Sequence, residues 1–178
     1  FPLNVPLRLA EKMKKGTLDD PLVRQFLPLK EELDKVEGFV ADPVGDSNCK
    51  LSSKLLHKYN GRVLLVTTSS CVMNCRFCFR QNFDYQVGEK SFAEELTAIG
   101  NDSTIKEVIL SGGDPLSLSH RILQPLIEGL AAIPHLKKIR FHTRFPIGIP
   151  ERIDGELLDL LGNCPLQVWF VIHCNHPT

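Results

Sequence analysis

The sequence predicts an α/β fold, with about four β/α units of a TIM-like barrel preceded by an N-terminal helical segment. From residue 62 onward, four strongly apolar runs alternate with helix-like segments, as in parallel sheets that are buried on both faces. Each run also ends in a polar cluster, and barrels of this kind place their active sites at the carboxyl ends of the strands. Four units would close about half of an eight-stranded barrel.

Composition limits the classes of protein that this chain can represent. The 178 residues suit one domain, and 21 Lys and Arg balance 21 Asp and Glu, so no net charge attracts nucleic acid or an anionic membrane. No long apolar span or signal peptide is present, which predicts a cytoplasmic protein whose clustered cysteines bind metal or catalyse. Because the chain opens at Phe1 rather than at a methionine, we expect a piece of a longer polypeptide.

Residues 1–60 form the predicted N-terminal helical segment. Breakers divide it, with Pro6 near the start of the first helix and Gly16 after its basic end. In chain order, the predicted elements are a helix over 6–16, one or two short helices over 19–34 around Pro28, a loop over 37–50 and a short helix over 51–59.

Residues 61–178 form the predicted first part of the barrel. The four strands cover 62–67, 106–116 (running into a glycine turn), 137–143 and 166–173, and the helices cover 90–100, 119–132 and 154–162. The fourth strand is expected to expose its edge, a liability that a further segment or a partner would have to cover.

Three thiols follow the first strand within eight residues, as Cys71, Cys75 and Cys78 in CVMNCRFC. A structural zinc site takes four ligands, usually as two close pairs, and unpaired core thiols are a further alternative. An ordinary four-iron cluster takes four cysteines. Three cysteines would leave one iron open, as a catalytic zinc keeps one position open for substrate. The spacing therefore favours a four-iron cluster with one open coordination site.

A glycine turn follows the second strand, as Gly112, Gly113 and Asp114 in LSGGDPL. Glycines let a backbone approach a ligand closely, and the aspartate offers an acceptor for an ammonium group. A plain strand-to-helix turn is the alternative interpretation.

Arg144 follows the third strand, and His173, Asn175 and His176 follow the fourth. The guanidinium fork of Arg144 suits a carboxylate, although a solvated arginine at a strand end is the ordinary alternative. Two histidines and an asparagine at one strand end indicate contact with a cofactor. We do not expect a separate metal site there, because no other cluster supplies the remaining ligands.

The C-x3-C-x2-C spacing, with the aromatic Phe77 before the last cysteine, resembles the signature of the radical S-adenosylmethionine superfamily. The resemblance implies a partial barrel of the radical SAM type, in which the open iron of a [4Fe-4S] cluster binds S-adenosylmethionine. One electron then cleaves the sulfonium to give a 5′-deoxyadenosyl radical. By the same resemblance, the residues that contact S-adenosylmethionine are Phe77 near the adenine, Gly112, Gly113, Asp114, Arg144, His173, Asn175 and His176.

A finer resemblance is to lysine 2,3-aminomutases, in which FPLNVP, LLHKYNGRVLLV, CRFCFRQNF, SGGDPL and HCNHP occur in matching order. It implies pyridoxal phosphate as a further cofactor and L-lysine as the substrate of an isomerase. Arg80 would bind the substrate carboxylate, while Arg62 and Lys58 would lie near the phosphate of pyridoxal phosphate. Lys58 stands where catabolic members carry arginine, so a bidentate contact becomes a point charge.

The resemblance also implies functional partners, but some family residues have no match here and some cysteines here have no role in the family. LLHKY and the small polar residues before Cys71 favour the branch that makes (R)-β-lysine for elongation factor P, with that factor and its lysyl ligase as functional partners; a homo-oligomer stays open. The family's pyridoxal-bearing lysine matches no residue here, so we expect this chain alone to be inactive. Cys49, Cys164 and Cys174 find no role and are interpreted as ordinary thiols. The alternatives are an aminomutase for another amino acid and a zinc-stabilised binding module without catalysis.

Overall fold

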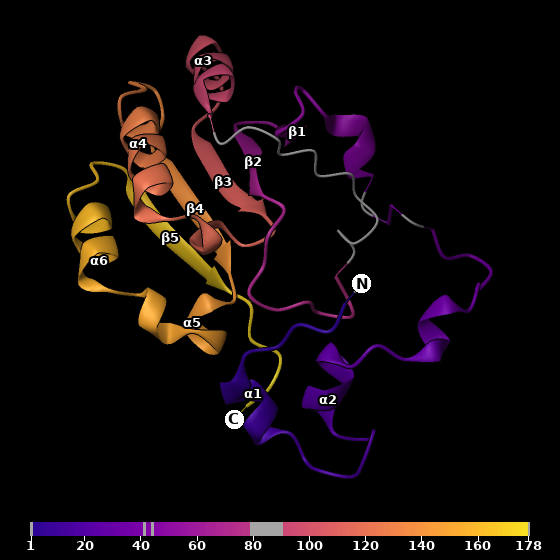
Figure 1. Cartoon of the computed structure of the whole chain (residues 1–178). Helices are drawn as coiled ribbons and strands as arrows, with labels where there is room; N and C mark the ends of the chain where they lie inside the picture. The colour runs from indigo at the N-terminus through magenta and orange to yellow at the C-terminus, as the bar shows by residue number, and fades with distance from the viewer. Residues whose placement is uncertain (1, 41, 44, 79–90, 178) are drawn as a thin grey trace.

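A five-stranded sheet in the order β1-β2-β3-β4-β5 organises the computed structural model, which describes residues 2–40, 42–43, 45–78 and 91–177 (Figure 1). The strands are β1 (Leu55–Tyr59), β2 (Arg62–Thr68), β3 (Glu107–Gly112), β4 (Lys138–Thr143) and β5 (Gln167–Ile172). Strands β2 to β5 are parallel, and β1 is antiparallel to β2. The α/β fold class and the four predicted strands are confirmed.

Strand β1 corrects the prediction of a short helix over 51–59. Leu55 and Leu56 are buried because they pair with Leu65 and Leu64 of β2, and this burial outweighs the local helix preference. The turn at Asn60-Gly61, where Gly61 has a φ of +77°, joins β1 to β2 as a hairpin. Asn-Gly between apolar runs is a strong hairpin signal, and the helix prediction overlooked it.

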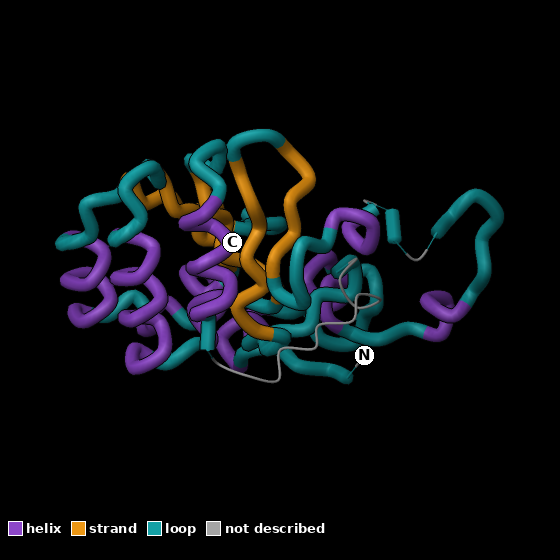
Figure 2. The backbone as a smooth tube through the Cα atoms, turned by 90° about the horizontal axis from the view of Figure 1, so that it is seen from above, coloured by secondary structure: helices purple, strands orange, loops and turns teal. Residues whose placement is uncertain are grey.

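Helices α3 (Ala93–Asn101), α4 (His120–Ala131) and α6 (Gly155–Gly162) lie on one side of the sheet (Figures 1 and 2). Their bounds match the predicted helices to within three residues. Leu65, Leu110 and Phe141 of the strands are fully buried in one core with side chains of all three helices. Because helices cover this face, the strands keep their apolar side chains away from water.

The part of the N-terminal segment before β1 consists of short helical elements (Figure 1). It contains α1 (Leu7–Lys12), α2 (Pro21–Phe26) and the 3-10 turns η1 (Lys30–Leu33) and η2 (Asp46–Cys49), the last of which falls inside the predicted loop. Asp20 caps α2 by accepting from the backbone N–H groups of Leu22 and Val23. A second small core of Leu9, Phe26 and Met73 joins this segment to the cysteine loop.

Three short elements after the strands were not predicted, namely η4 (Pro115–Ser117), α5 (Phe145–Gly148) and η5 (Pro150–Arg152). Prolines at their first turns suit such short helical pieces. Within the described ranges, no helix is long and apolar enough to cross a membrane.

The strand register brings the polar clusters to one edge of the sheet. Thr68 pairs with Gly112, and Thr143 pairs with Ile172, so neighbouring strands end at the same level. The cysteine loop, the glycine turn, Arg144 and His173 each follow one of these ends directly. The predicted gathering of chemistry at the carboxyl edge is confirmed.

Candidate functional site

A cavity of about 470 Å³ lies at this carboxyl edge. Four successive strand ends supply its walls: Cys71, Val72, Met73, Cys75 and Cys78 after β2, Gly112, Gly113 and Asp114 around the end of β3, His142, Thr143 and Arg144 around the end of β4, and Val171, Ile172 and His173 around the end of β5. All three predicted cluster ligands therefore line the same cavity, together with the glycine turn, Arg144 and one of the predicted histidines.

The glycines bring the end of β3 against the start of the cysteine loop. A Cβ on Gly112, whose φ is +110°, would lie 2.5 Å from the carbonyl oxygen of Thr68, and one on Gly113 would lie 2.1 Å from that of Ser70. The N–H of Gly113 donates to the Thr68 carbonyl at 2.6 Å, and that of Asp114 donates to the Ser70 carbonyl at 2.9 Å. The close approach expected toward a ligand is thus made here toward the neighbouring chain segment.

Asp114 is buried and fully engaged with protein donors. Its carboxylate accepts from the hydroxyl of Thr143 at 2.8 Å, the backbone N–H of Arg144 at 2.8 Å and that of Leu116 at 3.1 Å. Burial raises the pKa of the Asp114 carboxyl, and these hydrogen bonds oppose the rise. The carboxylate therefore ties the ends of β3 and β4 together, and its predicted contact with an ammonium group stays a prediction.

Arg144 is a buried arginine rather than a solvated one, with 8% of its surface exposed. Its Nη1 donates to Cys75 Sγ at 2.7 Å and its Nη2 donates to Gln25 Oε1 at 2.9 Å. The guanidinium carbon lies 5.5 Å from the ring centroid of Phe26 and 5.6 Å from that of Phe77. This places a cation directly beside one of the three thiols.

The surroundings of Cys75 act on its thiol in opposite directions. Burial raises the pKa of the Cys75 thiol above its ordinary value, and the charge of the Arg144 guanidinium and its hydrogen bond offset only part of that rise. A thiol must lose its proton to ligate metal. Arg144 is therefore placed to favour the ligating form of this cysteine.

Phe77 contacts His173, a residue that lines the cavity. Their ring centroids are 5.5 Å apart at an interplanar angle of 76°, an edge-to-face arrangement. The His173 backbone N–H donates to the Thr143 carbonyl at 3.0 Å, which holds the histidine beside β4. Phe77 itself is 47% exposed.

Other predicted residues lie apart from this cavity. Asn175 and His176 do not line it, since the chain after β5 runs toward α1 (Figure 1). Arg62 begins β2 and Lys58 lies near the end of β1, so both are at the β1–β2 hairpin, roughly 20 Å along β2 from the cysteine loop. The Lys58 Nζ lies 3.9 Å from an Asp46 carboxylate oxygen. Arg80 lies outside the described residues.

Residues of the N-terminal segment hold the cysteine loop, and no sequence pattern indicated this. The Asn74 N–H donates to the Asn4 carbonyl at 2.8 Å, and the Asn4 amide donates to the Cys71 carbonyl at 3.3 Å. The N–H of Arg76 donates to the Gln25 carbonyl at 2.8 Å. These contacts fix the loop backbone on both sides of Cys75.

The Arg76 side chain adds a bidentate ion pair to the same contact. Its Nε donates to Glu32 Oε1 at 2.7 Å, and its Nη2 pairs with the other carboxylate oxygen. The hydrogen bond and charge of Arg76 lower the pKa of Glu32. The partners are 44 residues apart in sequence, which explains why local patterns did not reveal the pair.

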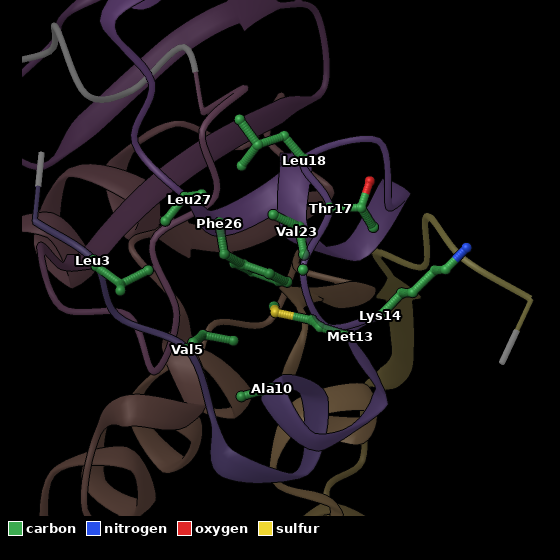
Figure 3. Close-up of a pocket in the computed structure, with 11 residues that line it drawn as sticks. Leu3, Val5, Ala10, Met13, Lys14, Thr17, Leu18, Val23, Phe26 and Leu27 are labelled. Carbon is green, nitrogen blue, oxygen red and sulfur yellow. The ribbon is translucent and has the colours of Figure 1, made fainter.

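A second cavity, of about 560 Å³, lies inside the N-terminal segment (Figure 3). Its walls are mostly apolar and come from α1, α2 and the loops next to them. Met13, Val23 and Phe26 face one another across it. Phe26 lines this cavity and contacts Arg144, which lines the cysteine cavity.

The three cysteines lie within a range that a known family model matches. The family described as "4Fe-4S single cluster domain" matches residues 59–147, a range that contains the whole cysteine loop, the glycine turn and Arg144. The chain belongs to this family.

Three relatives of this 4Fe-4S domain share one name. The chain is 42% identical to a protein of Haemophilus influenzae named L-lysine 2,3-aminomutase, over 99% of this chain and 53% of the relative. Proteins of the same name from Escherichia coli and Bacillus subtilis are 39% and 33% identical, over 99% and 98% of this chain and 52% and 38% of their own length. The chain spans about half the length of the first relatives it matches.

The donor set fits a four-iron cluster. Three thiols line one cavity, and a cluster places each thiolate on a different iron, so the sulfurs do not have to converge on a point. In the part of the chain that the structure describes, no three His, Cys, Asp or Glu side chains lie in the geometry of a single-ion site. The buried Arg144 offers the positive charge that an anionic cluster requires.

Proposed function

We propose that this 4Fe-4S domain is the cluster-bearing part of a radical S-adenosylmethionine isomerase, a lysine 2,3-aminomutase that converts L-lysine to (R)-β-lysine. The observation that carries the proposal is the single cavity lined by all three cysteines and by four successive strand ends. The names of the relatives support the substrate and the reaction class. Pyridoxal phosphate is the further cofactor that this reaction class implies.

The residues of the cavity divide into cluster ligands and S-adenosylmethionine contacts. Cys71, Cys75 and Cys78 would hold the [4Fe-4S] cluster, which supplies the electron that cleaves the sulfonium of S-adenosylmethionine. The proposed contacts to S-adenosylmethionine are Phe77, Gly112, Gly113, Asp114, Arg144, His173, Asn175 and His176. Among them, those that line the cavity are supported by their position, whereas Phe77, Asn175 and His176 rest on the resemblance.

The protein's own part is to orient these groups and to keep water away. Asp114 fixes the backbone of Arg144, and Arg144 in turn holds Cys75, so the β4 end sets the position of the thiol. Val72, Met73 and Val171 supply apolar wall, which strengthens electrostatic interactions by excluding solvent. A preorganised site of this kind places the reacting atoms before any chemistry begins.

The substrate side of the proposal rests on the resemblance. Arg80 would bind the lysine carboxylate, and Arg62 and Lys58 would bind the phosphate of pyridoxal phosphate. The elongation factor P branch, of the EpmB type, is proposed as the source of the physiological role, with elongation factor P and its lysyl ligase as functional partners. A cytoplasmic location and a homo-oligomer belong to the same proposal.

Replacing one cluster ligand tests the assignment. We expect Cys75→Ala to lose both the cluster and the cleavage of S-adenosylmethionine, because the remaining two thiols cannot hold three irons. Iron content, the visible spectrum and release of 5′-deoxyadenosine measure the two losses. Cys164→Ala is the matched control, since Cys164 packs against the main core outside the cavity and should leave both unchanged. A Cys75→Ala protein with full cleavage would refute the assignment.

A further inference from the structure

Gln25 on α2 is buried beside the cysteine cavity, although it lies 46 residues or more before the cysteines in sequence, and 7% of its surface is exposed. Its Nε2 donates to the Pro21 carbonyl at 3.3 Å, which orients the amide. Its Oε1 consequently points toward Arg144 and accepts from Nη2 at 2.9 Å. The Gln25 carbonyl also accepts from Arg76, so backbone and side chain of one residue both contact the site.

The guanidinium of Arg144 makes two hydrogen bonds that point in different directions. Nη1 reaches Cys75 Sγ, and Nη2 reaches Gln25. In the described part of the chain no carboxylate accepts from this guanidinium, because Asp114 bonds the backbone N–H instead. A buried cation is costly unless an anion lies close. The Asp114 carboxyl lies close enough for the charge of Arg144 to act on its pKa, and a cluster-bound sulfur at Cys75 would place a second negative group at Nη1.

The Arg144 guanidinium is planar and rigid, so the position of Nη1 depends on where Nη2 is held. Arginine presents its donors in a rigid plane, so an acceptor at Nη2 also fixes the direction of Nη1. The rings of Phe26 and Phe77 leave the plane little freedom. Removing the Gln25 acceptor would free the fork to turn away from Cys75.

We propose that Gln25 is a positioning residue of the cluster site, which holds the Arg144 guanidinium against the Cys75 sulfur and thereby raises the reduction potential of the cluster. The inference rests on the proposed function, since it requires a cluster on Cys75. Hydrogen bonds to a ligating sulfur and nearby positive charge stabilise the reduced, more negative cluster. The N-terminal segment thus tunes a site whose ligands belong to the sheet.

A double-mutant cycle on the cluster potential tests this inference. In the anaerobically reconstituted protein, Gln25→Met keeps the size of the side chain and removes its amide. We expect the ratio of reduced to oxidised cluster at a fixed potential to fall about tenfold, or about 59 mV for a one-electron couple. Arg144→Met should lower the ratio at least as much. In the double variant Gln25→Met should add nothing, because it acts through Arg144.

Arg24→Met is the matched control on the same helix. Its guanidinium pairs with exposed Asp19, away from the cavity, so this variant should keep the wild-type potential. Equal iron content and equal circular dichroism establish that the variants are folded. If Gln25→Met unfolds or loses iron, Gln25→Glu should restore the fold and the iron content, because it retains an acceptor. Failure of that rescue would overturn the inference.

The outcomes separate this inference from the proposed function. A wild-type protein that takes up no four-iron cluster refutes the proposed function. A wild-type protein with the cluster, whose potential is unchanged in Gln25→Met or shifts additively in the double variant, refutes only the role of Gln25.

Discussion

Gly113 illustrates how a single residue determines whether the site can assemble. Its missing Cβ would occupy space 2.1 Å from the Ser70 carbonyl oxygen, and backbone atoms cannot give way as a flexible side chain can. The turn is therefore a junction between two strand ends as well as a wall of the cavity. The sequence pattern identified the residue, and the structure identified its neighbour.

We expect Gly113→Ala to lower the free energy of unfolding by about 1–3 kcal/mol, the usual range for overpacking a tight site. Because the added methyl group would push Ser70 at the start of the cysteine loop aside, the variant should also lose iron faster to a chelator. Gly100→Ala is the control, since nothing lies within 4 Å of a Cβ at that position on α3. Urea unfolding measures the stability of both variants, and iron release to a chelator is measured separately. Equal stability of Gly113→Ala and Gly100→Ala would contradict this role of Gly113.

At the same scale, the sequence predicted where the functional residues lie better than what they contact. Arg144 was expected at a strand end and is found there, but its burial depends on Phe26 and Gln25, which are more than a hundred residues away in sequence. Distant contacts of this kind leave no periodic pattern in a sequence. Arg80, by contrast, lies outside the described residues, and its role stays a prediction.

At the scale of elements, the N-terminal segment acts as a support for the cysteine loop. Main-chain bonds from Asn74 and Arg76, together with the Arg76–Glu32 ion pair, connect the loop to that segment. The Arg76 side chain is 8% exposed and that of Glu32 is 30% exposed, so solvent screens this pair incompletely. The helices that the sequence predicted there turn out to serve the site.

We expect Glu32→Gln to destabilise the protein by roughly 0.5–1 kcal/mol at neutral pH and to speed iron release, because Arg76 loses its charged partner. The folded-state pKa of Glu32 is lowered below its ordinary value of 4.5, chiefly by the hydrogen bond from Arg76. The stabilisation is therefore fully present above about pH 4.5 and is lost as pH falls through the lowered pKa.

Urea midpoints measured across this pH range test the pair. The difference between wild type and Glu32→Gln should shrink on acidification, whereas Glu31→Gln on the same 3-10 turn should match wild type throughout. A difference that stays constant down to strongly acidic pH would show that the ion pair is not its source.

Element boundaries show where sequence reasoning succeeded and where it failed. The parallel strands were predictable because each carries apolar side chains, in continuous runs in β2 and in alternation in β4, that pack in one core with α3, α4 and α6. Strand β1 was missed because LLHKY is short and its partner, β2, determines its structure. Tertiary pairing overrides local propensity in such segments.

At the scale of the whole molecule, the fold gathers four strand ends at one edge and leaves β5 as an outer strand of the described sheet. Trp169, Val171 and Ile172 of that strand are all substantially exposed, at 55%, 44% and 48%. The cysteine cavity opens beside them, since Val171 and Ile172 also line it. The site thus lies next to an apolar strand face.

The central claim is that three cysteines hold a four-iron cluster with one iron open for S-adenosylmethionine. Anaerobic reconstitution, metal analysis and electron paramagnetic resonance of the reduced protein, with and without S-adenosylmethionine, test it most directly. We expect about four irons per chain and a cluster signal that changes when S-adenosylmethionine is added. A colourless protein with one tightly bound zinc and no such signal would contradict it.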